Sequence, residues 1–289
     1  MKRILLALLA IASCSLAQER KVAPTWLHRY APNLSETHTD FSTGSCHYTP
    51  IFGEGDSEPK ALQTVARFGE VTVDGGGSCG SVEYPRQEEL YFVLEGSGVL
   101  HYGDESHPMR KDDFAYAPPS VRHSISAASQ QPLRVVMATV KILQDTAIAT
   151  PPPKLKVANL DELKEQTVEG HPASVLYKLL IGPHTATRDR INTAYQVADF
   201  FLMDFAPGGT NFPHHHEVEE EVYLVLDGEG QMAAGSGTDG VMGLHPAKAG
   251  DAYYFRANCT VGFYNQDAPR AKAHIVALRT FVPVPKNPD

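Results

Sequence analysis

Three histidines stand in a row at residues 214–216, within the stretch NFPHHHEVEEEVYLVLDGEG (211–230). On a strand, side chains alternate between the two faces, so His214 and His216 would point to one side and His215 to the other. Glu221, at the start of the apolar run, can bring a carboxylate to the same place. The spacing therefore predicts one divalent metal held by His214, His216 and Glu221, against the alternative of histidines that only form hydrogen bonds.

The donor set also suggests which metal would bind. Two imidazoles and one carboxylate suit Fe(II) with coordination positions left open, and Mn(II), Zn(II) or Ni(II) would also fit. Fe(II) is favoured. The neighbouring Glu217, Glu219 and Glu220 are expected to form a solvated acidic turn, with Glu220 as a substitute ligand if the strand slips by one residue.

The elements that would position these ligands occur twice in the chain. QEELYFVLEGSG at residues 87–98 aligns with EEEVYLVLDGEG at residues 219–230, an offset of 132 (219 minus 87). Further on, KDDFAYAPPSVRH aligns with AGDAYYFRANCTV at an offset of 138, and the extra residues are expected in a hairpin loop at GSGTDG (235–240). The chain is therefore predicted to hold two copies of one module.

Each copy consists of short apolar runs separated by Gly, Pro and Asp turns, which is typical of β-strands. Examples are YFVLEG and LRVVMATV in the first copy, and VYLVLDG and AHIVALRTFV in the second. An all-β sandwich or barrel is expected for each copy. Between them, TPPPKLKV (150–157) predicts a stiff hinge, and NLDELKEQ (159–166) predicts a short helix capped by Asn159.

The second copy contains a spaced pattern of a glycine, five residues, His-x-His, four residues, a glutamate, six residues and a glycine. The residues that match it are Gly208, His214, His216, Glu221 and Gly228. This pattern resembles the first motif of the cupins, and the repeat makes the chain similar to a bicupin. The resemblance covers roughly residues 61–150 and 190–289 and implies two tandem jelly-roll barrels with a short helix between them.

The second cupin motif is only partly kept. Gly250 and Asn265 match it, but Arg256, Asn258 and Val261 stand where the family has proline, glycine and histidine. That histidine is the family's usual fourth ligand, so the resemblance implies three protein ligands here and an additional open position.

A fourth nitrogen could instead come from His245 or His274. Because similar bicupins that act on oxalate use four ligands, oxalate decarboxylation or oxidation is disfavoured.

The first copy has lost more of the metal motif. Val82 and Tyr84 occupy the two histidine positions, while Glu89 and His123 remain. A buried polar group needs a partner, so a hydrogen bond between Glu89 and His123 is expected. The first barrel is predicted to be structural, or to bind a ligand without a metal.

Three side chains near the second motif are candidates for binding substrate. Arg256 stands close to the expected barrel mouth, where a guanidinium could bind a carboxylate or phosphate. Tyr223 and Phe263 are expected to line the pocket. The alternative is a solvated arginine and aromatic residues that only fill the core.

The N-terminus has the layout of a secretory signal peptide. ILLALLAIA (4–12) follows two basic residues and precedes small ones. Cleavage after Ala17 is favoured, and a lipoprotein anchored through Cys14 is the alternative. In an exported chain, periplasmic or extracellular, disulfides persist. Cys46 and Cys79 are the favoured pair, and three unpaired thiols, with Cys259, are the alternative.

The formal charge of −9 and the absence of a Lys/Arg block argue against nucleic acid or an anionic membrane surface as the partner. The longest apolar run is too short to span a membrane. A small-molecule substrate is expected, and a homo-oligomer is left open.

The favoured function is a metal-dependent oxygenase, such as a dioxygenase. The alternatives are a metal-dependent lyase or isomerase acting on a sugar or hydroxy acid, and a non-catalytic binding cupin. The expected boundaries are signal peptide 1–17, N-terminal extension 18–60, first barrel 61–150, linker 151–189 and second barrel 190–289.

Overall fold

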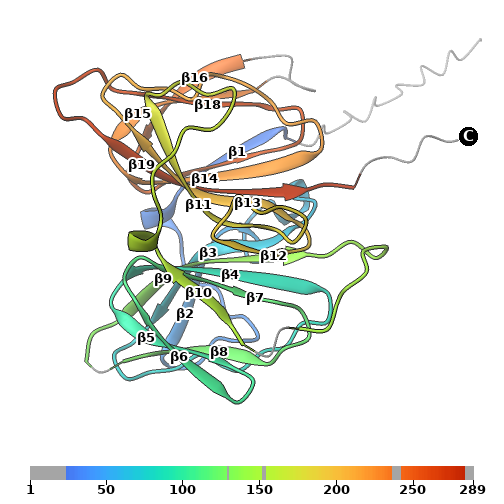
Figure 1. The fold of residues 1–289 in the computed structure, drawn as a ribbon. Coiled ribbons are helices and arrows are strands. Elements are labelled where there is room, and N and C mark those ends of the chain that lie inside the picture. Colours follow the sequence, from blue (N-terminus) through green and yellow to red (C-terminus); the bar gives the residue numbers. More distant parts are fainter. Residues whose placement is uncertain (1–23, 129, 152–153, 236–241, 284–289) are drawn as a thin grey trace, which may run out of the picture.

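The computed structural model describes residues 24–128, 130–151, 154–235 and 242–283. The expected signal peptide and residues 236–240 of the GSGTDG loop lie outside the described residues. Two β-barrels stand one above the other, with most of the first copy below in cyan to green and most of the second copy above in yellow to red (Figure 1). The predicted all-β fold of two tandem barrels is confirmed.

The strands follow the two copies along the chain. The first copy and the segment before it contain β1 (Trp26–Tyr30), β2 (Cys46–Gly53), β3 (Val65–Val73), β4 (Gln87–Glu95), β5 (Ser97–Tyr102), β6 (Glu105–Arg110), β7 (Asp113–Ala117), β8 (His123–Ala127) and β9 (Leu133–Lys141). The remainder contains β10 (Lys156–Asn159), β11 (Val175–Pro183), β12 (Ile191–Ala194), β13 (Val197–Phe205), β14 (Glu219–Asp227), β15 (Glu229–Gly235), β16 (Met242–Lys248), β17 (Asp251–Phe255), β18 (Thr260–Asn265) and β19 (Ala273–Phe281).

Helical structure in the described residues is limited to single 3₁₀ turns. These are η1 (Ala31–Asn33), η2 (Pro59–Ala61) and η3 (Leu160–Glu162). Asn159 caps η3, since its side chain accepts a hydrogen bond from the Asp161 N–H, and the Glu162 side chain accepts one from the Asn159 N–H. The cap predicted at Asn159 is therefore present, on a shorter helix than the sequence suggests. Within the part of the chain that the structure describes, no helix has the length and apolar content to cross a bilayer.

Each barrel is a large sheet facing a three-stranded sheet. In the first barrel the order β10-β7-β4-β9-β3-β2 faces β6-β5-β8, and in the second β1-β17-β14-β19-β13-β11-β12 faces β16-β15-β18. Buried side chains fill the interior of each barrel, and a third cluster lies between the two large sheets.

The apolar runs of β4 and β14 are continuous because both faces of these strands are buried. Along β14, Tyr223 and Val225 point into the second barrel, while Val222 and Leu224 join the cluster between the barrels. Alternating sides of a strand are thus covered by different cores. The register of this strand fixes Glu221 on the same side as Tyr223.

The two barrels exchange strands. β1 pairs antiparallel with β17 of the second barrel, and β10 pairs antiparallel with β7 of the first. β2 and β11 also belong to the sheets, although residues 18–60 and 151–189 were predicted to be an extension and a linker. Parts of both segments therefore belong to the barrels. The predicted boundaries missed them because they were set from the cupin motifs, which do not include these strands.

Two buried glutamates join the barrels reciprocally. Glu88 of β4 accepts hydrogen bonds from the backbone N–H groups of residues 195–197, at distances of 2.8–2.9 Å. Glu220 of β14 does the same for residues 63–65, at 2.7–2.8 Å. Glu220 is fully buried, so the expectation of a solvated acidic turn is wrong for this residue. It faces away from the metal ligands because neighbouring residues on a strand point to opposite sides.

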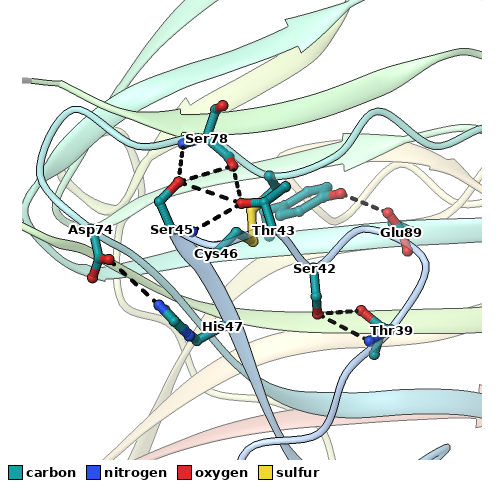
Figure 2. Close-up of a disulfide and its surroundings, with 11 residues drawn as sticks. Thr39, Ser42, Thr43, Ser45, Cys46, His47, Asp74, Ser78 and Glu89 are labelled. Atoms are coloured by element: carbon teal, nitrogen blue, oxygen red, sulfur yellow. Dashed lines mark hydrogen bonds and ion pairs between the residues drawn. A yellow bond between two sulfur atoms is a disulfide. The ribbon is translucent and has the colours of Figure 1, made fainter.

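A disulfide closes the first barrel at one edge. Cys46 at the start of β2 is bonded to Cys79, with their Cα atoms 4.9 Å apart. Figure 2 shows the bridge beside Ser78, whose carbonyl oxygen accepts a hydrogen bond from the Thr43 hydroxyl at 2.7 Å. The favoured cysteine pairing is therefore the one in the structure. Cys259 is a buried thiol outside this bridge.

Candidate metal centre

His214, His216 and Glu221 converge on one point inside the second barrel. One donor atom from each lies within 4.8 Å of the others, and this is the one cluster of such donors found among the described residues. Glu221 belongs to β14, whereas the two histidines lie on the connection between β13 and β14 and not on a strand. A single bridge of His214 to Val261 holds this connection against β18. The predicted convergence is thus present in the structure, although the strand expected to produce it is a loop.

A hydrogen bond orients His214, whereas His216 makes a longer polar contact with Glu221. The Nδ1 of His214 donates to the Phe212 carbonyl oxygen at 2.7 Å, which leaves Nε2 directed to the cluster as an acceptor. The Nε2 of His216 lies 3.4 Å from Oε2 of Glu221. Metal-binding histidines commonly hold their second nitrogen by such a bond to a carbonyl or carboxylate.

Two donor atoms of the cluster are buried without a well-formed hydrogen bond. They are Nε2 of His216 and Oε2 of Glu221. A buried polar atom left without a partner costs about 1–3 kcal/mol. A divalent cation bound between these atoms would satisfy both, so the residues present fit a metal.

The protonation states of the cluster also suit a cation. Burial lowers the pKa of His214 below its ordinary value, so this imidazole is neutral at neutral pH. Burial by itself would raise the pKa of Glu221, but the neighbouring His216 and the charge of Arg279 bring it below its usual range. A neutral imidazole and an ionised carboxylate are the forms that bind metals.

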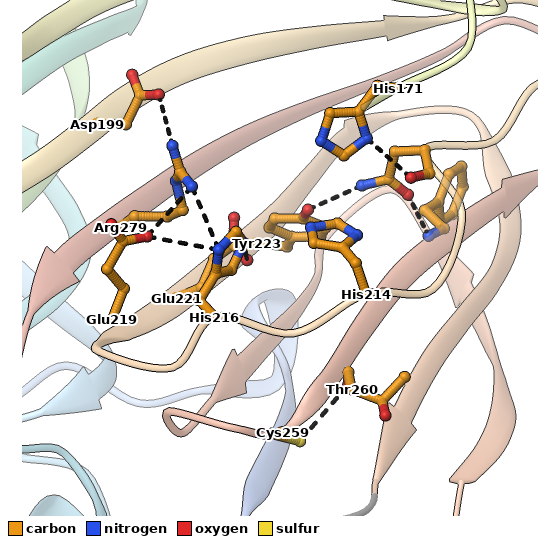
Figure 3. A network of polar contacts seen from close by, with 12 residues as sticks. His171, Asp199, His214, His216, Glu219, Glu221, Tyr223, Cys259, Thr260 and Arg279 are labelled. Carbon is orange, nitrogen blue, oxygen red and sulfur yellow. Dashed lines mark hydrogen bonds and ion pairs between the residues drawn. The ribbon is translucent and has the colours of Figure 1, made fainter. Parts of the chain in front are cut away.

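The cluster lies in the wall of a cavity of about 310 Å³. Arg279 of β19 and Asp199 of β13 stand on one side of the ligands, and His171 stands on the other (Figure 3). Arg279 donates to Asp199 at 3.0 Å and lies 3.1 Å from Glu219. Arg188 forms a second ion pair with Asp199. The cavity is therefore polar and contains charges of both signs.

These charged residues correct two expectations. Glu219 is not part of a solvated turn, because its side chain is 16% exposed and is paired with Arg279. The arginines that line the cavity are Arg188 and Arg279, whereas Arg256 is absent from the described residues that line it. Arg279 had one signal in the sequence, since it is a charged residue within the otherwise apolar run VALRTFV.

The other predicted substrate-binding residues divide between the cavity and the core. Tyr223 lines the cavity, and its hydroxyl accepts a hydrogen bond from Asn211 at 3.0 Å. Phe263 is fully buried against Phe205 and does not line the cavity. It fills the barrel, which is the alternative that the sequence left open.

The alternative histidines lie outside the cavity. His245 packs on Trp26 with ring centres 4.4 Å apart. His274 contacts Asp204 at 3.3 Å and Asp227 at 3.7 Å. Neither is placed to supply a nitrogen to the cluster.

In the first barrel, which lacks the histidine pair, the corresponding residues form hydrogen bonds with one another. Glu89 and His123 form the expected hydrogen bond, with Nε2 and Oε2 2.6 Å apart. Thr139 donates to the other oxygen of Glu89 at 2.7 Å. The remaining cavity there is about 10 Å³, room for no more than one water molecule. The first barrel is thus closed by its own side chains.

The two barrels also share a register. Val82 bridges His123 in the first barrel, and His214 bridges Val261 in the second. Val261 therefore occupies the place of His123, and Arg279 occupies the place of Thr139, since each stands opposite the cluster glutamate. These two replacements distinguish the second site from the first.

Comparison with known families agrees with this architecture. The cupin domain family matches residues 69–139 and 201–276, which together make up about half of the chain. The chain therefore belongs to the cupin family and contains two cupin domains.

Individual relatives are distant. A curated relative, the uncharacterized protein MJ1618 of Methanocaldococcus jannaschii, is 35% identical over 49 residues, which are 17% of this chain and 39% of that protein. The chain thus spans about two fifths of that relative's length.

Two solved structures are similar over most of their length. They are YlbA from E. coli (15% identity, 91% of this chain, 94% of that chain, TM-score 0.64) and the Lactobacillus farciminis oxalate decarboxylase formate complex (12% identity, 92% and 88%, TM-score 0.64). At these identities the likeness shows the bicupin fold alone.

Proposed function

We propose that the second barrel is the active site of a metal-dependent enzyme that acts on a small polar organic molecule. The observation that carries this proposal is the convergence of His214, His216 and Glu221, with buried unpaired donor atoms, in the wall of a cavity of about 310 Å³. Among the described residues, the corresponding cavity of the first barrel is about 10 Å³. One site per chain follows.

A metal bound by two imidazoles and one carboxylate would supply Lewis acidity and open positions for exogenous ligands. Fe(II) suits this donor set best. The chain's own residues would bind and orient the substrate. Arg279 is held by Asp199 and Glu219, so its guanidinium is fixed beside the ligands before any substrate arrives.

The polar wall bears on the two enzyme classes expected from the sequence. An oxygenase acting on a flat aromatic molecule would need a largely apolar pocket. Here Arg188, Arg279, Asp199 and His171 all line the cavity. This lining favours a lyase or isomerase acting on a sugar acid or hydroxy acid over the oxygenase.

The test begins with elemental analysis of protein purified without added metal. Oxygen uptake is then followed with catechols, flavonols and diketones, and product formation by NMR with sugar acids and hydroxy acids. Turnover in the second panel without oxygen uptake supports the lyase or isomerase. Oxygen consumption coupled to turnover in the first panel would support the oxygenase instead.

Two variants separate the role of the metal from that of the cavity wall. Glu221→Gln should lose metal and turnover together, because the anionic ligand is removed. Arg279→Thr introduces the residue that the first barrel has at the equivalent position. This variant should retain metal while losing turnover. Ligand binding that persists after chelation, without turnover in either panel, would point to a non-catalytic binding protein.

Export is part of the proposal. The Cys46–Cys79 disulfide supports it, because such bonds persist in oxidising compartments. Cell fractionation and mass spectrometry of the mature N-terminus test it. An N-terminus at Gln18 supports export by ordinary cleavage, a lipidated Cys14 supports the anchored form, and an intact Met1 in the cytoplasm contradicts both.

A further inference from the structure

One histidine in the cavity has no role in the three-ligand site. His171 lies in the segment between η3 and β11, and no sequence motif connects this segment with the metal. It lines the same cavity as the three ligands, and its side chain is partly buried there. Figure 3 places it above His214, on the side away from Arg279.

The tautomer of His171 is fixed by its hydrogen bond. Its Nδ1 lies 2.9 Å from the carbonyl oxygen of Asn211, which can only accept, so Nδ1 carries the proton. Nε2 then keeps its lone pair on the cavity side of the ring (Figure 3). His214 is oriented in the same way, by the Phe212 carbonyl oxygen. A second nitrogen held by a backbone carbonyl is typical of metal-binding histidines.

The ring separations match those of neighbouring ligands. His171 and His214 have ring centres 4.9 Å apart with planes at 73°, and His214 and His216 have centres 4.9 Å apart with planes at 86°. With metal–nitrogen bonds of about 2.1 Å, imidazoles at adjacent coordination positions have ring centres about 4.5–5 Å apart. His171 therefore stands beside His214 as a neighbouring ligand would.

The barrel itself leaves a position to be filled. Val261 stands where the first barrel has His123, and its side chain offers no donor. The cluster of atoms within 4.8 Å does not include a nitrogen of His171, so His171 must approach when the metal binds. Gly170, with a φ of +84°, precedes it, and a Cβ placed there would meet no atom within 4 Å, so no neighbouring atom packs against the turn on that side.

We propose that His171 is the fourth protein ligand of the metal, in place of the histidine missing at position 261. This inference rests on the proposed metal site and specifies it further. The ligand would come from the segment that precedes the second barrel, so that this segment closes over the metal.

The test uses copper(II) as the probe, and pulsed electron paramagnetic resonance to count the imidazoles bound to it. The wild-type protein should show three, and His171→Ala and His171→Gln should each show two. The copper dissociation constant, from competition with a chelator, should rise about tenfold or more in both variants.

The matched control is His184→Ala. The Nδ1 of His184 also donates to a backbone carbonyl, that of Ala194 at 3.0 Å, but this residue does not line the cavity. Three imidazoles should remain in this control. The double variant His171→Ala/Val261→His should return the count from two to three, because position 261 bridges His214. Circular dichroism confirms that each variant is folded.

Two imidazoles in wild type, with no change in His171→Ala, would overturn the assignment of His171 and leave the three-ligand site intact. A copper signal that is unaffected by His216→Ala would instead refute the metal site itself. The two failures are therefore distinguishable.

Discussion

Asp189→Asn should flatten part of the dependence of the protein's stability on pH. Asp189 is 5% exposed, and its carboxyl group is buried close to that of Asp199. Neither oxygen of Asp189 has a hydrogen-bond partner among the described residues, and Nε of Arg188 lies 3.6 Å from Oδ2. Gly182 makes room for this arrangement, because a Cβ there would lie 2.1 Å from Oδ2 of Asp189.

The expected magnitude follows from the pKa of this group. Burial, together with repulsion by Asp199, raises the pKa of Asp189 from 3.8 to about 7. At pH values between 3.8 and about 7, Asp189 stays protonated in the folded protein but is ionised in the unfolded chain. Stability from this group is therefore full below about pH 4 and is lost as pH rises to about 7. At about 1.4 kcal/mol per pKa unit the upper limit is about 4 kcal/mol, and screening by solvent reduces it to about 2 kcal/mol.

The assay is thermal unfolding of metal-free protein from pH 4 to pH 8. Relative to wild type, Asp189→Asn should gain about 2 kcal/mol between pH 4 and pH 7.5, or about 4–8 °C in Tm. Asparagine can donate to Asp199 without carrying a charge. Asp267→Asn, which changes an exposed carboxylate outside the cavity, is the control and should give no such gain. Parallel curves for wild type and Asp189→Asn would refute the raised pKa of Asp189.

Three further changes test other parts of the structure. In a chain that carries His171→Ala, Val261→His should tighten metal binding at least tenfold in a chelator competition, because position 261 bridges His214 as His123 bridges Val82. Unchanged affinity would mean that the new imidazole does not reach the metal. Glu220→Gln should lower the free energy of unfolding, measured in urea, by about 2–4 kcal/mol, because a neutral amide cannot replace a carboxylate that accepts three buried N–H groups. A change below about 1 kcal/mol would argue that this glutamate does not hold the two barrels together. Cys46→Ser should lower the free energy of unfolding by about 3–4 kcal/mol, because it removes a cross-link that spans 33 residues. An equal melting temperature of wild type with and without reductant would show that the disulfide does not stabilise the fold.

The sequence was sufficient for the parts of the fold that repeat. The shared pattern of glutamate, apolar run and glycine in β4 and β14 predicts two barrels, and the spacing of the ligands predicts which imidazoles converge. Both predictions depend on short-range periodicity. The exchanged strands β1 and β10 could not be predicted in this way, because each occurs outside the repeat and pairs with a distant strand.

The ligands of the site were more predictable than its walls. His214, His216 and Glu221 are within eight residues of one another, so local geometry brings them together. Arg279, Asp199 and His171 reach the cavity from separate segments, and only tertiary packing shows that they meet. Glu220 was misjudged for a similar reason, since its partners at residues 63–65 belong to the other barrel.

The central claim is one metal site per chain, in the second barrel. Elemental analysis of the purified protein tests it most directly, comparing wild type with single alanine variants of His214, His215 and His216. The account predicts about one divalent metal per chain in wild type and in His215→Ala, because that side chain is exposed, and none in the other two variants. Two equivalents that survive His216→Ala, or none in wild type after metal is supplied, would contradict it.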